Sequence, residues 1–338
     1  MAKALGRRRV NAAMASIISA LLDEARQAYP RIRQSHEPEG LHDFRVALRR
    51  LRSLLKDFRS QPGVAVDKEL YRQLTALSRA TNDARDREVM LAWLDEQVAT
   101  SGAAERGALG WWRERLAPQV DREYARLDAP IASFPMLDAK LREAANRARG
   151  KRAALGSSAK RKSTRKQDVR EAPRFGVASA EVLERLRDQW LSELAQVRVG
   201  AEEEALHRPR ITGKRLRYLL KPWREQGSAF VELEDEMKRF QDAFGDLHDD
   251  LVRADALTAA ALQHAEDEML ERLASAATDA PARASAPRHL RGFMLLHGRQ
   301  QEQTEVHLTR VMTLCRRPPL ERLAARFEEA AQQMRAAS

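Results

Sequence analysis

Apolar residues recur along most of the chain at intervals of three and four, which is the period of an amphipathic α-helix. This pattern predicts helices over residues 10–29, 41–59, 68–80, 85–99, 104–128, 136–149, 179–199, 206–223, 230–244, 248–263, 289–310 and 320–336. Asp67 is a good N-cap for the third of these. No stretch alternates with the period of a strand, so we expect an all-α protein.

Residues 150–176 interrupt the helical pattern. They contain Gly, Ser, Lys and Arg with almost no large apolar residue, and they include a basic run at 160–162. We therefore expect a first helical bundle over residues 1–149, a basic linker or loop over 150–176, and a second helical bundle over 177–338. Short connections between amphipathic helices favour antiparallel bundles.

The helix expected at 41–59 carries a cationic stripe beside its apolar face. The spacing of three, four, three and four places its members within one narrow stripe. They are His42, Arg45, Arg49, Arg52 and Lys56. Like charges at these spacings destabilise a helix by about 0.2–0.5 kcal/mol per pair, and a solvated face normally mixes signs. The stripe spans about 21 Å at 1.5 Å per residue, which suits a long, repeating anion better than one phosphate.

The same stripe returns 165 residues later, and residues 40–58 align with 205–223 without a gap. Its members are His207, Arg210, Lys214, Arg217 and Lys221. Two unrelated amphipathic helices would share the period but not every cation in register. The repeat therefore indicates an internal duplication. It also lowers the weight of the alternative, in which each stripe is simply a solvated basic face.

A second repeated element follows each stripe, at residues 77–89 and 240–252. Equivalent places hold Arg85-Asp86 and His248-Asp249. The structural interpretation is a helix–helix junction with Asn82 or Gly245 as the C-terminal turn. The functional interpretation adds Arg85 and His248 to the anion site, and the two interpretations are compatible.

Composition agrees with a basic, globular, helical protein. The 338 residues are 43% hydrophobic and 32% charged, with a net charge of +11, so an acidic polymer or surface is a plausible partner. Charge alone does not choose among DNA, RNA, anionic lipid and polyphosphate. Cys315 is the sole cysteine, which excludes an intrachain disulfide and a CxxC metal site. No apolar run approaches the roughly 18 residues of a membrane span, and we expect a cytoplasmic protein.

The two stripe helices resemble the signature helices of the CHAD family, the conserved histidine α-helical domain. The likeness lies in His-x-x-Arg-Val-x-x-Arg-Arg-Leu-Arg from residue 42 and His-x-x-Arg-Ile-x-x-Lys-Arg-Leu-Arg-Tyr from residue 207. Arg85-Asp86 and Gln241-Asp242 resemble the family's later motifs, whereas Asn82 and His248 depart from its usual glycine and asparagine. The resemblance implies two four-helix bundles related by pseudo-twofold symmetry, with a basic central groove or pore. It also implies non-enzymatic binding of inorganic polyphosphate and targeting to polyphosphate granules.

The resemblance also implies which residues bind the polymer. Arg79, Arg85, Tyr218 and His248 are added from the repeated elements, and no catalytic residue, cofactor or metal is expected. The full candidate set is His42, Arg45, Arg49, Arg50, Arg52, Lys56, Arg79, Arg85, His207, Arg210, Lys214, Arg215, Arg217, Tyr218, Lys221 and His248.

Two other classes of function stay open at this point. An enzyme acting on phosphate polymers would need clustered carboxylates for a metal, or an activated histidine. A metal site assembled from His42, Asp86, His207 and Asp249 is compatible with the sequence. A nucleic-acid-binding architectural protein draws its best argument from the basic linker, although aromatic residues that stack on bases are sparse.

Overall fold

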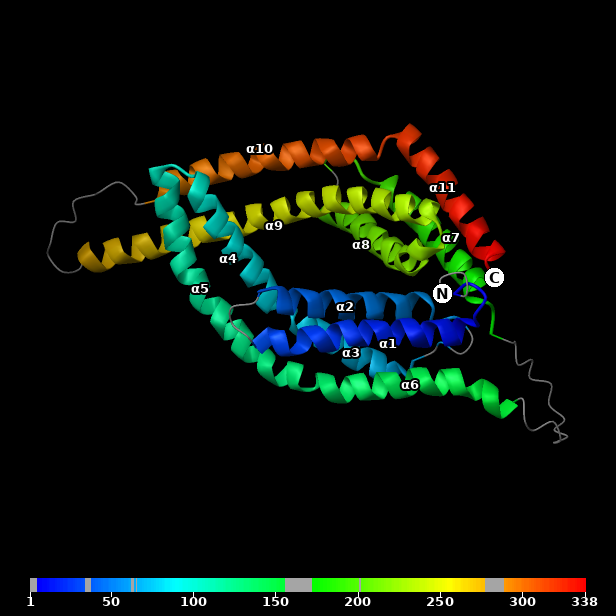
Figure 1. Ribbon diagram of the computed structural model, residues 1–338. Helices are drawn as coiled ribbons and strands as arrows, with labels where there is room; N and C mark the ends of the chain where they lie inside the picture. Colours follow the sequence, from blue (N-terminus) through cyan, green and yellow to red (C-terminus); the bar gives the residue numbers. More distant parts are fainter. Residues whose placement is uncertain are drawn as a thin grey trace. The chain divides into compact units, whose positions relative to one another are not determined.

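A computed structural model describes residues 5–33, 38–61, 64, 66–155, 172–200, 202–276 and 289–338 (Figure 1). Every regular element in these ranges is helical, which confirms the all-α prediction. The one β-bridge found there is an isolated pair, Arg9 and Arg174. None of the helices within these ranges has both the length and the hydropathy needed to cross a bilayer.

The first helices follow the predicted pattern closely. They are α1 (Val10–Ala28), the 3₁₀ helix η2 (Tyr29–Arg33), α2 (Pro38–Asp57), α3 (Lys68–Ala80), α4 (Asn82–Thr100), α5 (Ala103–Ala132) and α6 (Phe134–Leu155). The predicted cap of α3 is confirmed, because the Asp67 carboxylate accepts hydrogen bonds from the backbone N–H groups of Glu69 and Leu70. The predicted pause after α3 is a single residue, Thr81.

The remaining helices are α7 (Phe175–Leu194), α8 (Glu203–Leu220), the 3₁₀ helix η3 (Lys221–Gln226), α9 (Ser228–Ala276), α10 (Leu290–Leu314) and α11 (Arg317–Ala336). α8 ends at Leu220, and Pro222 stands in the first turn of η3, into which the chain tightens. Two consecutive prolines stand in the first turn of α11, where a missing N–H costs no helical hydrogen bond.

The prediction of a helix–helix junction at Gly245 is wrong. α9 runs without a break from Ser228 to Ala276. A glycine inside a helix costs about 1 kcal/mol relative to alanine. Ala243, Phe244 and Leu247 beside it are at most 3% exposed, so the burial of the helix face outweighs that penalty.

Other boundaries also differ from the predicted pattern. α5 continues past Pro130 to Ala132, although a proline inside a helix removes a backbone hydrogen bond and costs about 3 kcal/mol. α6 continues into the predicted linker as far as Leu155, and α7 already begins at Phe175. The basic run at 160–162 lies outside the described residues.

The chain packs into two compact units. The first comprises Met1–Asn82, Leu127–Gln241 and Leu314–Ser338, and the second comprises Asp83–Arg126 and Asp242–Thr313. Each unit takes segments from both halves of the sequence, so the packing divides the chain differently from the expected bundles at 1–149 and 177–338. The expected division into bundles at 1–149 and 177–338, the pseudo-twofold symmetry and the central groove or pore stay predictions.

Within the first unit, helices of the two halves pack in the same order. α1 packs against α2 and α6, and α7 packs against α8 and α11. This is the pattern expected from a duplication. At one end of the unit, the ring of Phe175 stacks between Phe58 and Trp223, with centroid distances of 5.7 and 5.6 Å. Phe58 and Trp223 are 165 residues apart and are therefore equivalent positions of the repeat. Both stack on the single ring of Phe175.

The second unit has its own core. Its buried apolar residues come from α4, α5, α9 and α10. Aromatic rings meet edge to face there, as in Trp93 and Trp112 with centroids 6.0 Å apart.

Candidate functional site

The two cationic stripes lie on α2 and α8, which pack against each other within the first unit. A hydrogen bond joins them, in which Arg49 Nε donates to the hydroxyl oxygen of Tyr218 at 2.9 Å. Tyr218 is 8% exposed, so its ring fixes the position of the arginine from the core side. The structure therefore brings the two predicted stripes onto adjacent helices, which the sequence alone left open.

The first turns of the α2 stripe are held by neighbouring polar groups. Arg45 Nη1 donates to Thr81 Oγ1 at 2.8 Å and to Asn82 Oδ1 at 2.9 Å. Both acceptors are uncharged, and they lie at the junction between α3 and α4. His42, one turn earlier on α2, is half-buried. This explains Asn82 at the place where the sequence motif usually has glycine: its side chain positions a stripe arginine.

The middle of the α2 stripe is a cluster of like charges. Burial lowers the pKa of the half-buried Arg52 guanidinium, and the neighbouring Arg79 and Arg49 lower it further, while Tyr71 and Tyr218 oppose the shift. Within the described part of the chain, Arg52 forms no hydrogen bond or ion pair with a carboxylate. Positive charge is therefore concentrated around Arg52 without a nearby negative partner.

This cluster is accessible from solvent. Arg79 on α3 and Lys56 in the last turn of α2 are both exposed. Neither side chain forms an ion pair or hydrogen bond with any residue that the structure describes. An anion in solution can therefore reach Arg79, Arg52 and Lys56 without displacing a carboxylate of the described residues.

Other predicted cations are paired with acids from neighbouring helices. Arg50 forms an ion pair with Glu24 of α1. Arg215 donates through two nitrogens to the carboxylate of Asp57, which is 3% exposed. These arginines hold helices together. This structural role was not visible in the helical periodicity. That Arg50 and Arg215 also contact a ligand stays a prediction.

The α8 stripe is neutralised at its centre. Arg217 Nε donates to Glu234 Oε1 at 2.6 Å, and Arg217 Nη1 donates to Gln241 Oε1 at 3.1 Å. Glu234 is 5% exposed and also pairs with Arg224. Arg217 is the repeat counterpart of Arg52, so equivalent arginines have opposite surroundings in the two halves.

The rest of the α8 stripe is partly covered. His207, Arg210 and Lys214 are half-buried. Lys221 is exposed at the end of the stripe, yet neighbouring protein atoms withhold part of its water and so lower the pKa of its ammonium group. Arg50 adds to this shift by repulsion, while Glu24 opposes it.

Comparison with known proteins identifies the family. The CHAD domain matches residues 16–258, which is most of the chain. The chain belongs to the CHAD family. The crystal structure of the CHAD domain from the plant Ricinus communis is similar over 96% of this chain and 93% of that one, with 18% identity and a TM-score of 0.60. PptA from Streptomyces chartreusis shows 14% identity over 90% of this chain and 99% of that one, with a TM-score of 0.49. No curated protein matches.

Among the differences between the two CHAD repeats, the position of Tyr71 beside the stripe bears on the site. Extending the register of the second repeated element six residues upstream aligns Tyr71 with Glu234. Tyr71 lies near Arg52, and Glu234 binds its counterpart Arg217. A phenol in the first repeat therefore stands where the second repeat has a buried carboxylate. Sequence reasoning missed Tyr71, although it precedes Arg79 by two helical turns on α3.

The last two candidate residues of the CHAD motifs, Arg85 and His248, belong to the second unit, whereas the others belong to the first. Arg85 Nη1 donates to Glu88 Oε2 at 2.6 Å, so its charge is already compensated. His248 is half-buried on the continuous helix α9. Glu88 also accepts a hydrogen bond from Tyr124 at 2.9 Å.

One group of side chains in this CHAD domain has metal-binding geometry. Glu39, His42 and Asp43 each offer a ligand atom, and the three atoms lie within 4.8 Å of one another. Arg31 donates to Asp43 at 2.8 Å, which competes with a cation for the same oxygen. In the metal site considered from the sequence, His42 and His207 belong to the first unit, and its two aspartates belong to the second.

Proposed function

We propose that this CHAD protein binds inorganic polyphosphate without chemical turnover, along a track formed by Arg49, Arg52, Lys56 and Arg79. The observation that carries the proposal is the environment of Arg52. It is half-buried among other cations and contacts no carboxylate within the described residues. In contrast, the charge of its counterpart Arg217 is compensated within the protein by Glu234.

The energetics favour an anion at this track. A half-buried cation loses hydration, and like charges nearby add repulsion, so both effects oppose folding until a negative charge arrives. A phosphate oxygen supplies that charge, and hydrogen bonds to charged groups contribute about 1.5–3 kcal/mol each. The stripe from His42 to Lys56 covers about 21 Å, so several phosphates of one chain fit along it.

The track suits a phosphate polymer better than a nucleic acid. Single-stranded nucleic acids bind through stacking on exposed aromatic rings, worth about 1–3 kcal/mol per base. The two tyrosines beside the track are half-buried or buried, Tyr71 and Tyr218 respectively. The site therefore offers charge and hydroxyl groups, but little ring surface for a base.

The test is a comparison of affinities by fluorescence anisotropy. Long-chain polyphosphate should bind more tightly than single-stranded DNA of equal charge, and its affinity should fall steeply with salt. Arg52→Gln should weaken binding by at least tenfold, since one charge-assisted contact is lost. Arg322→Gln is the matched control, because it removes an exposed arginine of α11 that forms no ion pair with any residue the structure describes. Equal affinity for both polymers, or an unchanged affinity in Arg52→Gln, would contradict the proposal.

The absence of turnover and the cellular site are part of the same proposal. Polyphosphate incubated with the protein and Mg²⁺ or Mn²⁺ should release no phosphate. Release that disappears in His42→Ala or His207→Ala would establish an enzyme instead. In cells, a fluorescent fusion should collect at polyphosphate granules in the cytoplasm, and Arg52→Gln should disperse it.

A further inference from the structure

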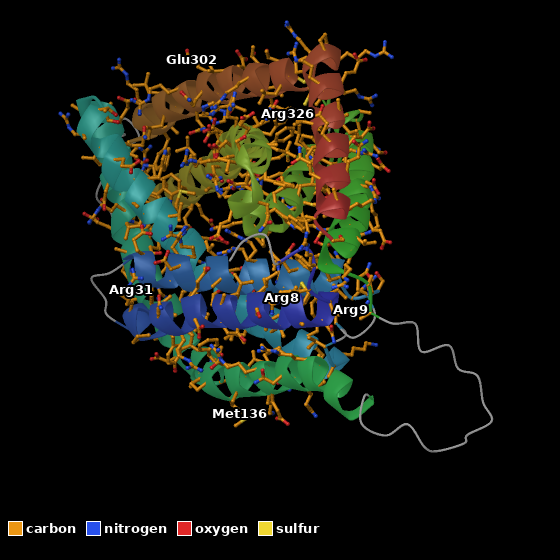
Figure 2. The ribbon with its side chains drawn as sticks, turned by 45° about the vertical axis from the view of Figure 1, so that its right-hand side comes forward. Arg8, Arg9, Arg31, Met136, Glu302 and Arg326 are labelled. Carbon is orange, nitrogen blue, oxygen red and sulfur yellow. The ribbon has the colours of Figure 1, made fainter. Side chains whose placement is uncertain are left out.

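A group of arginines closes the amino-terminal end of α1 against the start of α7. We call it the arginine clasp: Arg7, Arg8, Arg9 and Arg174. Backbone hydrogen bonds from Val10 N to Pro173 O at 2.9 Å and from Phe175 N to Arg8 O at 2.8 Å pair the two segments. Figure 2 shows Arg8 and Arg9 at this end of α1.

The geometry of the clasp gathers positive charge. The two backbone bonds flank the bridge between Arg9 and Arg174, so these two residues form the close, non-hydrogen-bonded kind of pair, with side chains on one face. Like charges directly opposite each other destabilise such a pair. The same two arginines are the N-caps of α1 and α7, where the helix dipole disfavours cations, and neither first turn contains an acid.

The protein supplies only uncharged partners to most of the clasp. Arg8 Nη2 donates to Ala12 O at 2.8 Å and to Ser16 Oγ at 2.7 Å, and Arg174 donates to the carbonyl of Arg7. The Arg7 side chain is exposed. Among the residues that the structure describes, no carboxylate contacts Arg7, Arg8 or Arg174.

The clasp lies at the end of the α2 stripe. Arg59 follows Lys56 at the stripe's own spacing of three, and it is exposed without an ion pair in the described ranges. The ring of Phe58, next to Arg59, stacks on the ring of Phe175, next to Arg174, at 5.7 Å. The stacked rings therefore bring the backbone of Arg59, just past the end of α2, close to that of Arg174 in the clasp.

We infer that the arginine clasp, together with the neighbouring Arg59, is a second contact site for the same phosphate polymer, occupied by the part of the chain that extends past Lys56. This inference rests on the proposed function. A short oligophosphate held at Arg52 does not reach the clasp, whereas a long chain bridges both. The ligand is therefore a linear phosphate polymer longer than the stripe.

The test compares chain lengths in the double variant Arg7→Gln, Arg59→Gln. Both side chains are exposed and unpaired within the described structure, so the fold should persist. Affinity for long-chain polyphosphate should fall about tenfold, as expected for two exposed charge contacts. The slope of log affinity against log salt should become shallower by about 1.4, or ~0.7 per contact. Affinity for tripolyphosphate should not change.

The matched control is the double variant Arg239→Gln, Arg322→Gln, which removes the same charge from exposed positions of the first unit that have no ion pair in the described part of the chain. Its affinity for long chains should stay close to that of the unmodified protein. Unchanged long-chain affinity and salt slope in the clasp variant would overturn the inference. Equal losses for both chain lengths, or an equal loss in the control, would overturn it too. If Arg52→Gln weakens both ligands while the clasp variant weakens neither, only the clasp fails and the proposed function stands.

Discussion

Replacing the repeat counterparts Arg52 and Arg217 by glutamine should have opposite effects on stability. The two arginines occupy the same position of the duplicated helix and differ in their partners. Arg217 binds Glu234 and Gln241, whereas Arg52 lies among cations without a carboxylate contact in the described residues. We expect Arg217→Gln to destabilise the first unit and Arg52→Gln to leave it unchanged or more stable.

The magnitudes follow from the contacts. Arg217→Gln removes a charge-assisted hydrogen bond to a buried carboxylate, worth about 1.5–3 kcal/mol. Glu234 keeps Arg224 as a partner, so we expect a net loss of about 2 kcal/mol. For a unit of about 200 residues this corresponds to a decrease of ~4–8 °C in Tm. Arg52→Gln relieves repulsion and desolvation but loses part of the packing of its stem, for a gain of about 0–1 kcal/mol.

Thermal unfolding followed by far-UV circular dichroism is a suitable assay, at low and at high salt without polyphosphate. Salt should reduce the difference between Arg52→Gln and the unmodified protein, because it screens the repulsion. Saturating polyphosphate should raise the Tm of the unmodified protein more than that of Arg52→Gln. A loss of stability in Arg52→Gln as large as that in Arg217→Gln would refute the reasoning, because it would show that Arg52 has a stabilising partner.

Three further predictions concern single side chains. Asp57→Ala should cost about 3–5 kcal/mol in the free energy of unfolding, measured by chemical denaturation, because Arg215 loses its buried partner; a loss below 1 kcal/mol would argue against the pairing. Because the pKa of Lys221 is lowered, this side chain loses its charge at a lower pH than an ordinary lysine (~10.4) does. As the pH is raised, the affinity for polyphosphate should therefore begin to decrease before pH ~10.4 is reached. Anisotropy should show the fall delayed in Lys221→Arg, and identical curves would exclude Lys221. Burial raises the pKa of Cys315 to about 12, so alkylation followed by mass spectrometry should be on the order of a thousandfold slower than for a free cysteine (~8.5), and full in the unfolded chain.

The helices could be predicted because their signals are local. The apolar period and the Asp67 cap each act within a few residues, and the structure confirms both. Gly245 shows the limit of such signals. Its local cost is small compared with the burial of neighbouring Phe244 and Leu247, which depends on residues far away in the sequence.

The candidate site was less predictable, because its electrostatics depend on tertiary contacts. The spacing of cations correctly indicated that α2 and α8 carry two stripes. It could not show that Glu24, Asp57 and Glu234, each from another part of the chain, would neutralise some members and leave others. Tyr71 was missed for the same reason, since only packing of α3 against α2 brings it near Arg52.

The first repeat has Tyr71 where the second has Glu234, and this difference determines whether the stripe arginine of each repeat is bound by an internal carboxylate. A carboxylate at that position acts as a built-in competitor that occupies the arginine permanently, whereas a phenol leaves the arginine available to an incoming polymer. Under the proposed function, the two copies of one helix therefore differ in their roles: α8 stabilises the packing of its repeat, and α2 contacts the polymer. Swapping the two side chains should exchange those roles and leave the backbone as it is.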